Sequence, residues 1–251
     1  MKRRDLVDII GEAVGGMVFP ITILEVTAAG DQKRLKFCDT MHAQINFFLT
    51  INDTPYKILA VGGTIYITIN TSDTINAGDI AYLYKPKFTY GTPVETATET
   101  AKIGAMVDGF PLSWLRLNFT EKINKWNNTT EREADIDLYF LTLCKHGDLT
   151  YQDLHIVGII PMRSLAESFV DYIQSPAQLG NFNTDDIEYS IDNYEKLGIY
   201  IREKGSDKQL IGKNLTGVCL SIKIKLYRGS KCLDCSQDDI LLTDDDEILT
   251  T

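Results

Sequence analysis

The sequence contains few of the residues from which metal and catalytic sites are most often built. Only three histidines and five cysteines occur in 251 residues. An odd number of cysteines is typical of a protein made in a reducing compartment, where disulfides are rare. Cys232 and Cys235 form one Cys-x-x-Cys pair, but a structural zinc site needs a second ligand pair at suitable spacing, and none follows. We therefore expect free thiols, no metal ion and no cofactor.

Long apolar runs and excess positive charge are also missing. No stretch of about 18 apolar residues occurs, so no membrane-spanning helix is expected. Residues 1–4 look like the start of a signal peptide, but Asp5, Asp8 and Glu12 interrupt the apolar segment that would have to follow. The 25 basic residues are outnumbered by 35 acidic ones, which gives a net charge of −10. This balance argues against binding to a phosphate backbone, and we expect no sequence-specific nucleic acid binding.

Known catalytic motifs are absent as well. No Gly-x-Ser-x-Gly stretch is present to expose a nucleophilic serine. Gly205 and Gly212 precede a lysine as in a nucleotide-binding loop, but six residues separate them and Asn214 replaces the hydroxyl residue that would hold magnesium. We expect no catalytic residue and predict that the protein is not an enzyme.

The N-terminal half is rich in short strand-forming segments. Residues 5–15 predict a helix, because their apolar side chains recur on one side and two aspartates lie near its start. From about residue 33 to 90, β-favouring runs alternate with turn signals such as Asn52-Asp53 and Gly62-Gly63. This spacing predicts a meander or a small barrel.

The C-terminal half has a different pattern. Strands are predicted at 110–123, 136–144, 197–203 and 217–227, a polar loop at 124–134, and a strand at 156–160 that leads into an amphipathic helix. The order predicts an α+β fold: mostly antiparallel β structure, with a β-rich N-terminal insertion or subdomain and a helix-packed C-terminal sheet. The expected divisions are a helix at 1–16, the β-rich subdomain at 17–90, a linker or arm at 91–109, an α+β domain at 110–228 and an acidic tail at 229–251.

The second half resembles the tail-terminator and head–tail completion proteins of tailed bacteriophages. The resemblance rests on the order of four segments, FPLSWLRL, IDLYFLTLC, HIVGIIPMRSLAESFVDYI and GVCLSIKIKLY. The stretch YKPKFTYGTPVETATETAKIG, followed by PLSWL, also resembles virion proteins of phages that infect Bacteroidota. The resemblance covers roughly residues 85–227. The β-rich N-terminal part and the acidic tail depart from the usual short terminator protein.

The resemblance implies a structural virion protein that forms a ring in the neck or tail connector, between portal and tail. The expected partners are further copies of the chain and portal, neck or tail proteins. Exposed apolar residues in the arm, the polar loop and the tail are then the candidate subunit contacts. These residues are Tyr90, Pro93, Trp126, Ile240, Leu241 and Leu242.

Two other readings remain open. One is a non-catalytic β-rich module that binds protein or carbohydrate, which would require a secretion signal. The other is an enzyme whose site is assembled from Glu133, Asp135 and Asp137, and it would require a pocket that strongly shifts their pKa values.

Overall fold

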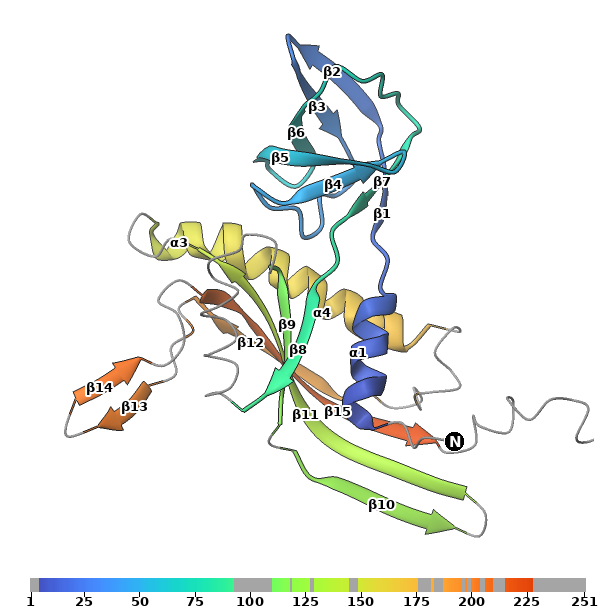
Figure 1. Cartoon of the computed structure of the whole chain (residues 1–251), viewed down its shortest axis with the longest axis vertical. Helices are drawn as coiled ribbons and strands as arrows, with labels where there is room; N and C mark the ends of the chain where they lie inside the picture. Colours follow the sequence, from blue (N-terminus) through green and yellow to red (C-terminus); the bar gives the residue numbers. More distant parts are fainter. Residues whose placement is uncertain are drawn as a thin grey trace, which may run out of the picture.

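The computed structural model describes residues 5–92, 110–117, 119–126, 129–144, 149–175, 182, 187–195, 197, 200–203, 206–209 and 215–227. A β-rich unit lies at one end, and a second sheet with packed helices lies at the other (Figure 1). With one exception, the strand pairs are antiparallel. The predicted α+β class is confirmed.

The β-rich unit is a small barrel of seven short strands. They are β1 (Pro20–Thr22), β2 (Glu25–Ala29), β3 (Gln32–Lys36), β4 (Phe48–Ile51), β5 (Thr54–Gly62), β6 (Tyr66–Asn70) and β7 (Ile80–Leu83). They pair in the order β1-β7-β4-β5-β6-β3-β2. Because β1 and β2 follow each other directly in the chain, the two ends of this order meet and the sheet closes on itself.

The barrel interior follows from side-chain alternation. In β6, Ile67 and Ile69 point inward and are fully buried. Asn52 and Asp53 join β4 to β5 with φ angles of 49° and 62°, the left-handed conformation of a tight hairpin turn. The turn signal at these two residues is therefore confirmed.

The second sheet is built from six strands. They are β8 (Lys87–Gly91), β9 (Leu112–Arg116), β10 (Glu121–Trp126), β11 (Thr129–Leu143), β12 (Tyr189–Tyr194) and β15 (Leu215–Tyr227). Their order is β12-β15-β11-β9-β8, with β8 and β9 parallel, while β10 pairs with the other end of β11. A separate hairpin is formed by β13 (Tyr200–Glu203) and β14 (Ser206–Gln209).

Helices cover one face of this sheet. They are α1 (Leu6–Gly16) and a continuous helical segment of α3 (Tyr151–Leu154), the π-helix η2 (His155–Ile159) and α4 (Ile160–Ile173). Leu138, Phe140 and Leu220 from the sheet and Phe169 from α4 are fully buried in the layer between them. In β15, Ser221, Lys223 and Lys225 are partly exposed and alternate with the buried Ile222, Ile224 and Leu226, whereas residues 215–220 are all buried.

The strand predicted at 156–160 is wrong, because these residues are helical. Thr150 starts the helix by accepting a hydrogen bond from the Asp153 backbone N–H at 3.2 Å. Pro161 has no N–H, so the carbonyl of Val157, four residues earlier, lacks its usual helical donor. The side chain of Gln44 donates to that carbonyl at 2.6 Å, which satisfies it from outside the helix.

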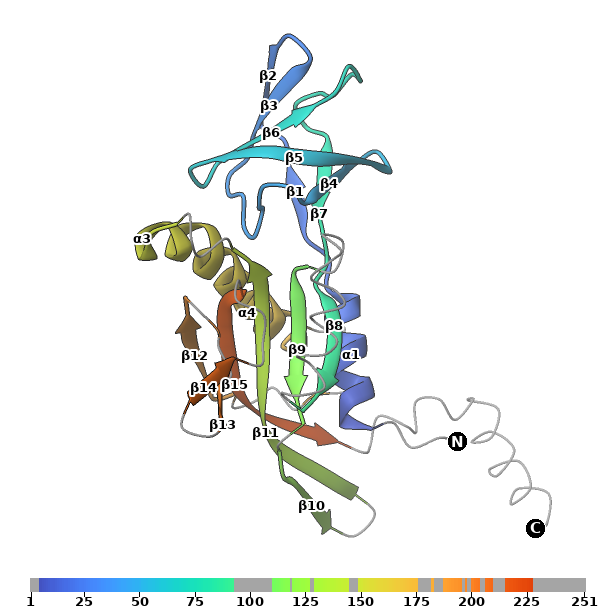
Figure 2. The same cartoon turned by 60° about the vertical axis from the view of Figure 1, so that its left-hand side comes forward.

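Two further expectations also change. The expected boundary after residue 90 falls inside β8, which pairs with β9 of the second sheet. Residues 124–126 and 129–134, which were predicted as part of a polar loop, are paired strand residues of the β10–β11 hairpin, in which Trp126 pairs with Thr129. The chain leaves α1, forms the barrel and returns through β8, which makes the barrel an insertion between two elements of the second unit (Figure 2).

Candidate protein-binding surfaces

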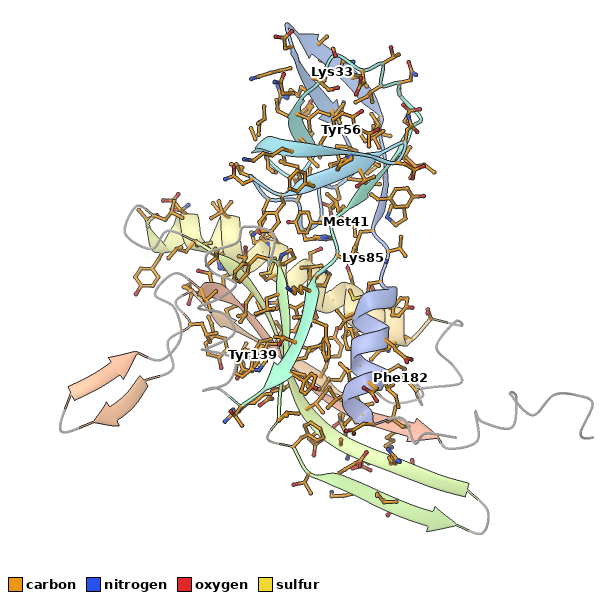
Figure 3. The ribbon with its side chains drawn as sticks, in the orientation of Figure 1. Lys33, Met41, Tyr56, Lys85, Tyr139 and Phe182 are labelled. Atoms are coloured by element: carbon orange, nitrogen blue, oxygen red, sulfur yellow. The ribbon has the colours of Figure 1, made fainter. Side chains whose placement is uncertain are left out.

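The barrel is joined to the second unit by a buried amide. Gln44, in the loop between β3 and β4, is 8% exposed. Its Nε2 donates to the Val157 carbonyl in η2, and its Oε1 accepts from the Thr142 hydroxyl in β11 at 2.8 Å. Lys85, which is labelled in Figure 3 and lies between β7 and β8, donates to the Gly15 carbonyl at 3.1 Å and so connects this segment to the end of α1. The junction is therefore held at several points.

His42 lies in the same loop and is completely buried. Its Nε2 donates to the Tyr84 carbonyl at 2.9 Å, because a carbonyl can only accept. The Phe19 and Tyr84 rings meet it edge-on, at centroid distances of 4.3 and 5.0 Å. Burial lowers the pKa of His42 to about 4, and its Nδ1 has no hydrogen-bond partner within the described residues. This environment is that of a neutral structural histidine and not of an acid–base catalyst.

The helical segment beyond the junction exposes apolar side chains. Ile156, Val157 and Ile160 are 53%, 40% and 46% exposed, and they lie within one turn of one another. We call these three residues the apolar platform. Tyr151, one turn earlier, and Ile45, next to Gln44 in the chain, are also at least half exposed. Clustered apolar side chains of this kind mark surfaces that bind other proteins.

The backbone of the apolar platform packs closely against the second sheet. A Cβ at Gly158 would lie 2.5 Å from the Thr216 methyl carbon and 3.1 Å from the Cys144 sulfur. Only glycine therefore lets η2 approach the ends of β11 and β15 so closely. Together with the Gln44 hydrogen bond to Val157, this contact fixes the exposed side of the helix relative to the sheet.

A groove runs between α1 and β8. Its volume is about 280 Å³, and it is lined by Val7, Asp8, Gly11, Glu12, Phe88 and Tyr90. A Cβ at Gly11 would lie 2.9 Å from the Phe88 ring, so glycine allows the helix to rest on this aromatic side chain. Asp8 and Glu12 are exposed, and Tyr90 is 56% exposed. The groove thus has aromatic walls and two carboxylates.

The face of the second sheet opposite the helices carries charged side chains, including several near the β10–β11 hairpin. Glu133 is 2.7 Å from the Lys223 ammonium and 4.0 Å from that of Lys122, and its hydrogen bond to Lys223 lowers the pKa of the carboxyl. Asp137 is 3.7 Å from Arg116 and accepts from the Ser221 hydroxyl at 2.7 Å. These are cross-strand ion pairs, in contrast to the like-charged, raised-pKa pair expected of catalytic carboxylates.

The other chemically active side chains lie apart. Cys38 is exposed, and Cys144 and Cys219 are buried free thiols. Burial raises the pKa of Cys219 to about 11, which opposes formation of a reactive thiolate. Within the described ranges, no three His, Cys, Asp or Glu side chains gather as metal ligands, and no helix combines the length and apolarity needed to cross a membrane. Cys232 and Cys235 lie outside those ranges.

The structure places two of the six predicted contact residues. Tyr90 is an exposed residue of β8 on the groove, and the backbone of Trp126 forms the last position of β10. The Trp126 side chain and all of Pro93, Ile240, Leu241 and Leu242 lie outside the described residues. The platform was not predicted from the sequence. Its signal was the apolar run at 156–160, because a helix over these residues has more apolar side chains than one buried face needs.

Comparison with known proteins gives no family assignment: neither the family models nor the curated proteins searched match this chain.

Proposed function

We propose that the protein is a non-catalytic structural subunit that acts by binding other protein subunits. The apolar platform is the single observation that carries this proposal, because its side chains are exposed while the backbone beneath them is fixed by Gly158 and Gln44. A surface fixed in advance loses little conformational entropy when it binds a partner.

The setting we propose is the neck or tail connector of a tailed phage, between portal and tail. It is supported by the resemblance of residues 85–227 to tail-terminator and head–tail completion proteins. The prominent β10–β11 hairpin in Figure 1 is a suitable element for contacts between subunits.

The size of the platform suits one part of such an interface. Complete burial of a large aliphatic side chain contributes about 1.5–3 kcal/mol, and these three side chains are already about half buried. Burial of the rest would contribute on the order of 3 kcal/mol in total, or about a hundredfold in affinity.

We expect the double variant Ile156→Asp, Ile160→Asp to lose binding to the portal or tail proteins of the same phage by at least about tenfold, because two carboxylates would have to be buried at the contact. Co-purification of tagged protein produced together with these partners measures the loss. Asn70→Asp, which adds charge to an exposed position on barrel strand β6, is the control and should bind normally.

Circular dichroism should show that both proteins keep the wild-type fold, since Ile156, Ile160 and Asn70 are exposed. Equal capture of the double variant and the control would contradict the role of the platform. Failure of the wild-type protein to capture any portal, neck or tail protein would contradict the proposed setting.

A further inference from the structure

We infer that the groove between α1 and β8 binds the β10–β11 hairpin of a second copy of this chain, an inference that rests on the proposed function because it names the protein itself as one of the bound subunits. The groove and the hairpin occupy different parts of one molecule (Figures 1 and 2). A contact between them is therefore heterologous and can repeat from one copy to the next.

The groove has the chemistry to bind a lysine side chain. Phe88 and Tyr90 form apolar walls along which the methylene chain of a lysine can pack. Asp8 and Glu12 lie on one side of α1, four residues apart, and supply negative charge beside those walls. An ammonium group can also lie over the face of Tyr90, which is more than half exposed. The volume of about 280 Å³ has room for one or two side chains.

The hairpin offers a suitable lysine. Lys122 lies in β10 with its side chain 67% exposed, and its neighbour Ile123 is 52% exposed. Lys122 is 4.0 Å from Glu133, whereas Lys223 is only 2.7 Å from the same carboxylate. Because Lys223 keeps Glu133 paired, Lys122 can turn toward another molecule without leaving a carboxylate unpartnered.

Charge favours a contact of this kind between copies. The chain carries a net charge of −10, so two copies repel each other unless an acidic surface meets a basic one. The groove contributes two carboxylates, and the exposed strand β10 contributes Lys122. Both partners are exposed, so added salt should weaken the contact.

Two variants test the contact from its two sides. Tyr90→Ala removes an aromatic wall of the groove and the ring face on which the ammonium can lie, and Lys122→Glu reverses the charge on the hairpin. We expect the wild-type protein to self-associate in sedimentation experiments, and each variant alone to do so at least about tenfold more weakly. Asn70→Asp, on the exterior of the barrel, should behave as the wild type.

Mixing the two variants gives the sharper result. The Lys122→Glu copy keeps an intact groove and the Tyr90→Ala copy keeps an intact hairpin, so one wild-type contact can form between them. We expect the equimolar mixture to form dimers that do not grow further. Recovery of dimers also shows that both variants are folded, and circular dichroism of each variant checks this independently.

Three results would overturn the inference: a wild-type protein that stays monomeric at every concentration, variants that assemble like the wild type, or a mixture of folded variants that remains monomeric. If both variants assemble like the wild type, or if the wild-type protein is a monomer that binds portal or tail proteins through the platform, the inference fails but the proposed function stands. A monomer that binds none of them would contradict both proposals.

Discussion

Gly217→Ala is expected to lower the free energy of unfolding by roughly 3 kcal/mol. Gly217 lies near the start of β15, where it is buried and paired with Leu141 of β11 and Tyr194 of β12. A Cβ at this position would overlap the carbonyl oxygen of Phe140 and lie 3.0 Å from the Leu141 Cα. Both neighbours are backbone atoms of a paired strand and cannot turn away as a flexible side chain can. Urea unfolding followed by circular dichroism measures the change.

Gly15→Ala is the matched control for this substitution. Gly15 lies in α1, is exposed, and has no atom within 4 Å of an added Cβ. Alanine is favoured over glycine inside a helix, so this variant should be more stable than the wild type by about 0.5–1 kcal/mol. An unfolding midpoint for Gly217→Ala at or above that of the wild type would show that the sheet does not pack as described.

The second large effect concerns pH and His42. Its pKa is about 4 in the folded protein, against an ordinary value of 6.5. Between pH 4 and 6.5 the His42 side chain binds a proton in the unfolded chain but not in the folded protein. The free energy of unfolding is therefore not reduced by His42 above pH 6.5, and it falls as the pH drops toward 4. This difference between the two pKa values corresponds to about 3 kcal/mol in the free energy of unfolding. The cause is burial between Phe19 and Tyr84, where an N–H at Nδ1 would find no acceptor among the described residues.

We expect His42→Asn to remove most of this pH dependence, because asparagine does not titrate and its amide can still donate a hydrogen bond. Free energies of unfolding measured in urea at several pH values between 4 and 7 provide the comparison. The carboxyl groups of Glu133, Asp73 and Asp153 also have lowered pKa values, but they start from lower ordinary values and contribute mainly below this window. An unchanged slope in the variant would assign the pH dependence to other groups.

The sequence predicted elements whose signals are local. The strand at 217–227, the helix at 5–15 and the turn at Asn52-Asp53 each depend on neighbouring residues, and all three occur in the structure. The fold class followed from the order of these elements. For the same reason, strands β4 to β6 lie within the β-favouring region predicted from about residue 33 to 90.

The errors arose where distant residues decide the structure. Residues 156–160 have the composition of a strand, but they are helical next to Pro161, whose effect on the Val157 carbonyl is compensated by Gln44, more than a hundred residues earlier in the sequence. The parallel pairing of β8 with β9 likewise spans the segment between them. The β10–β11 hairpin lacks a clear apolar face at its tip, so its sequence looked like a loop.

The candidate surfaces were predicted only in part. Tyr90 was selected for its expected exposure, which the structure confirms at 56%. The groove beside it depends on Gly11 bringing α1 onto Phe88, a contact between elements separated by the whole barrel. The platform was not predicted because Ile156, Val157 and Ile160 were interpreted as part of a strand.

The most direct test of the central claim, that this protein works by binding other subunits, is its mass in solution by light scattering. The mass should be measured alone and after mixing with the portal and tail proteins that the proposed function names as partners. We predict a multiple of the 28.2 kDa chain or a complex with at least one of these proteins. A mass of 28.2 kDa under every condition would contradict the account.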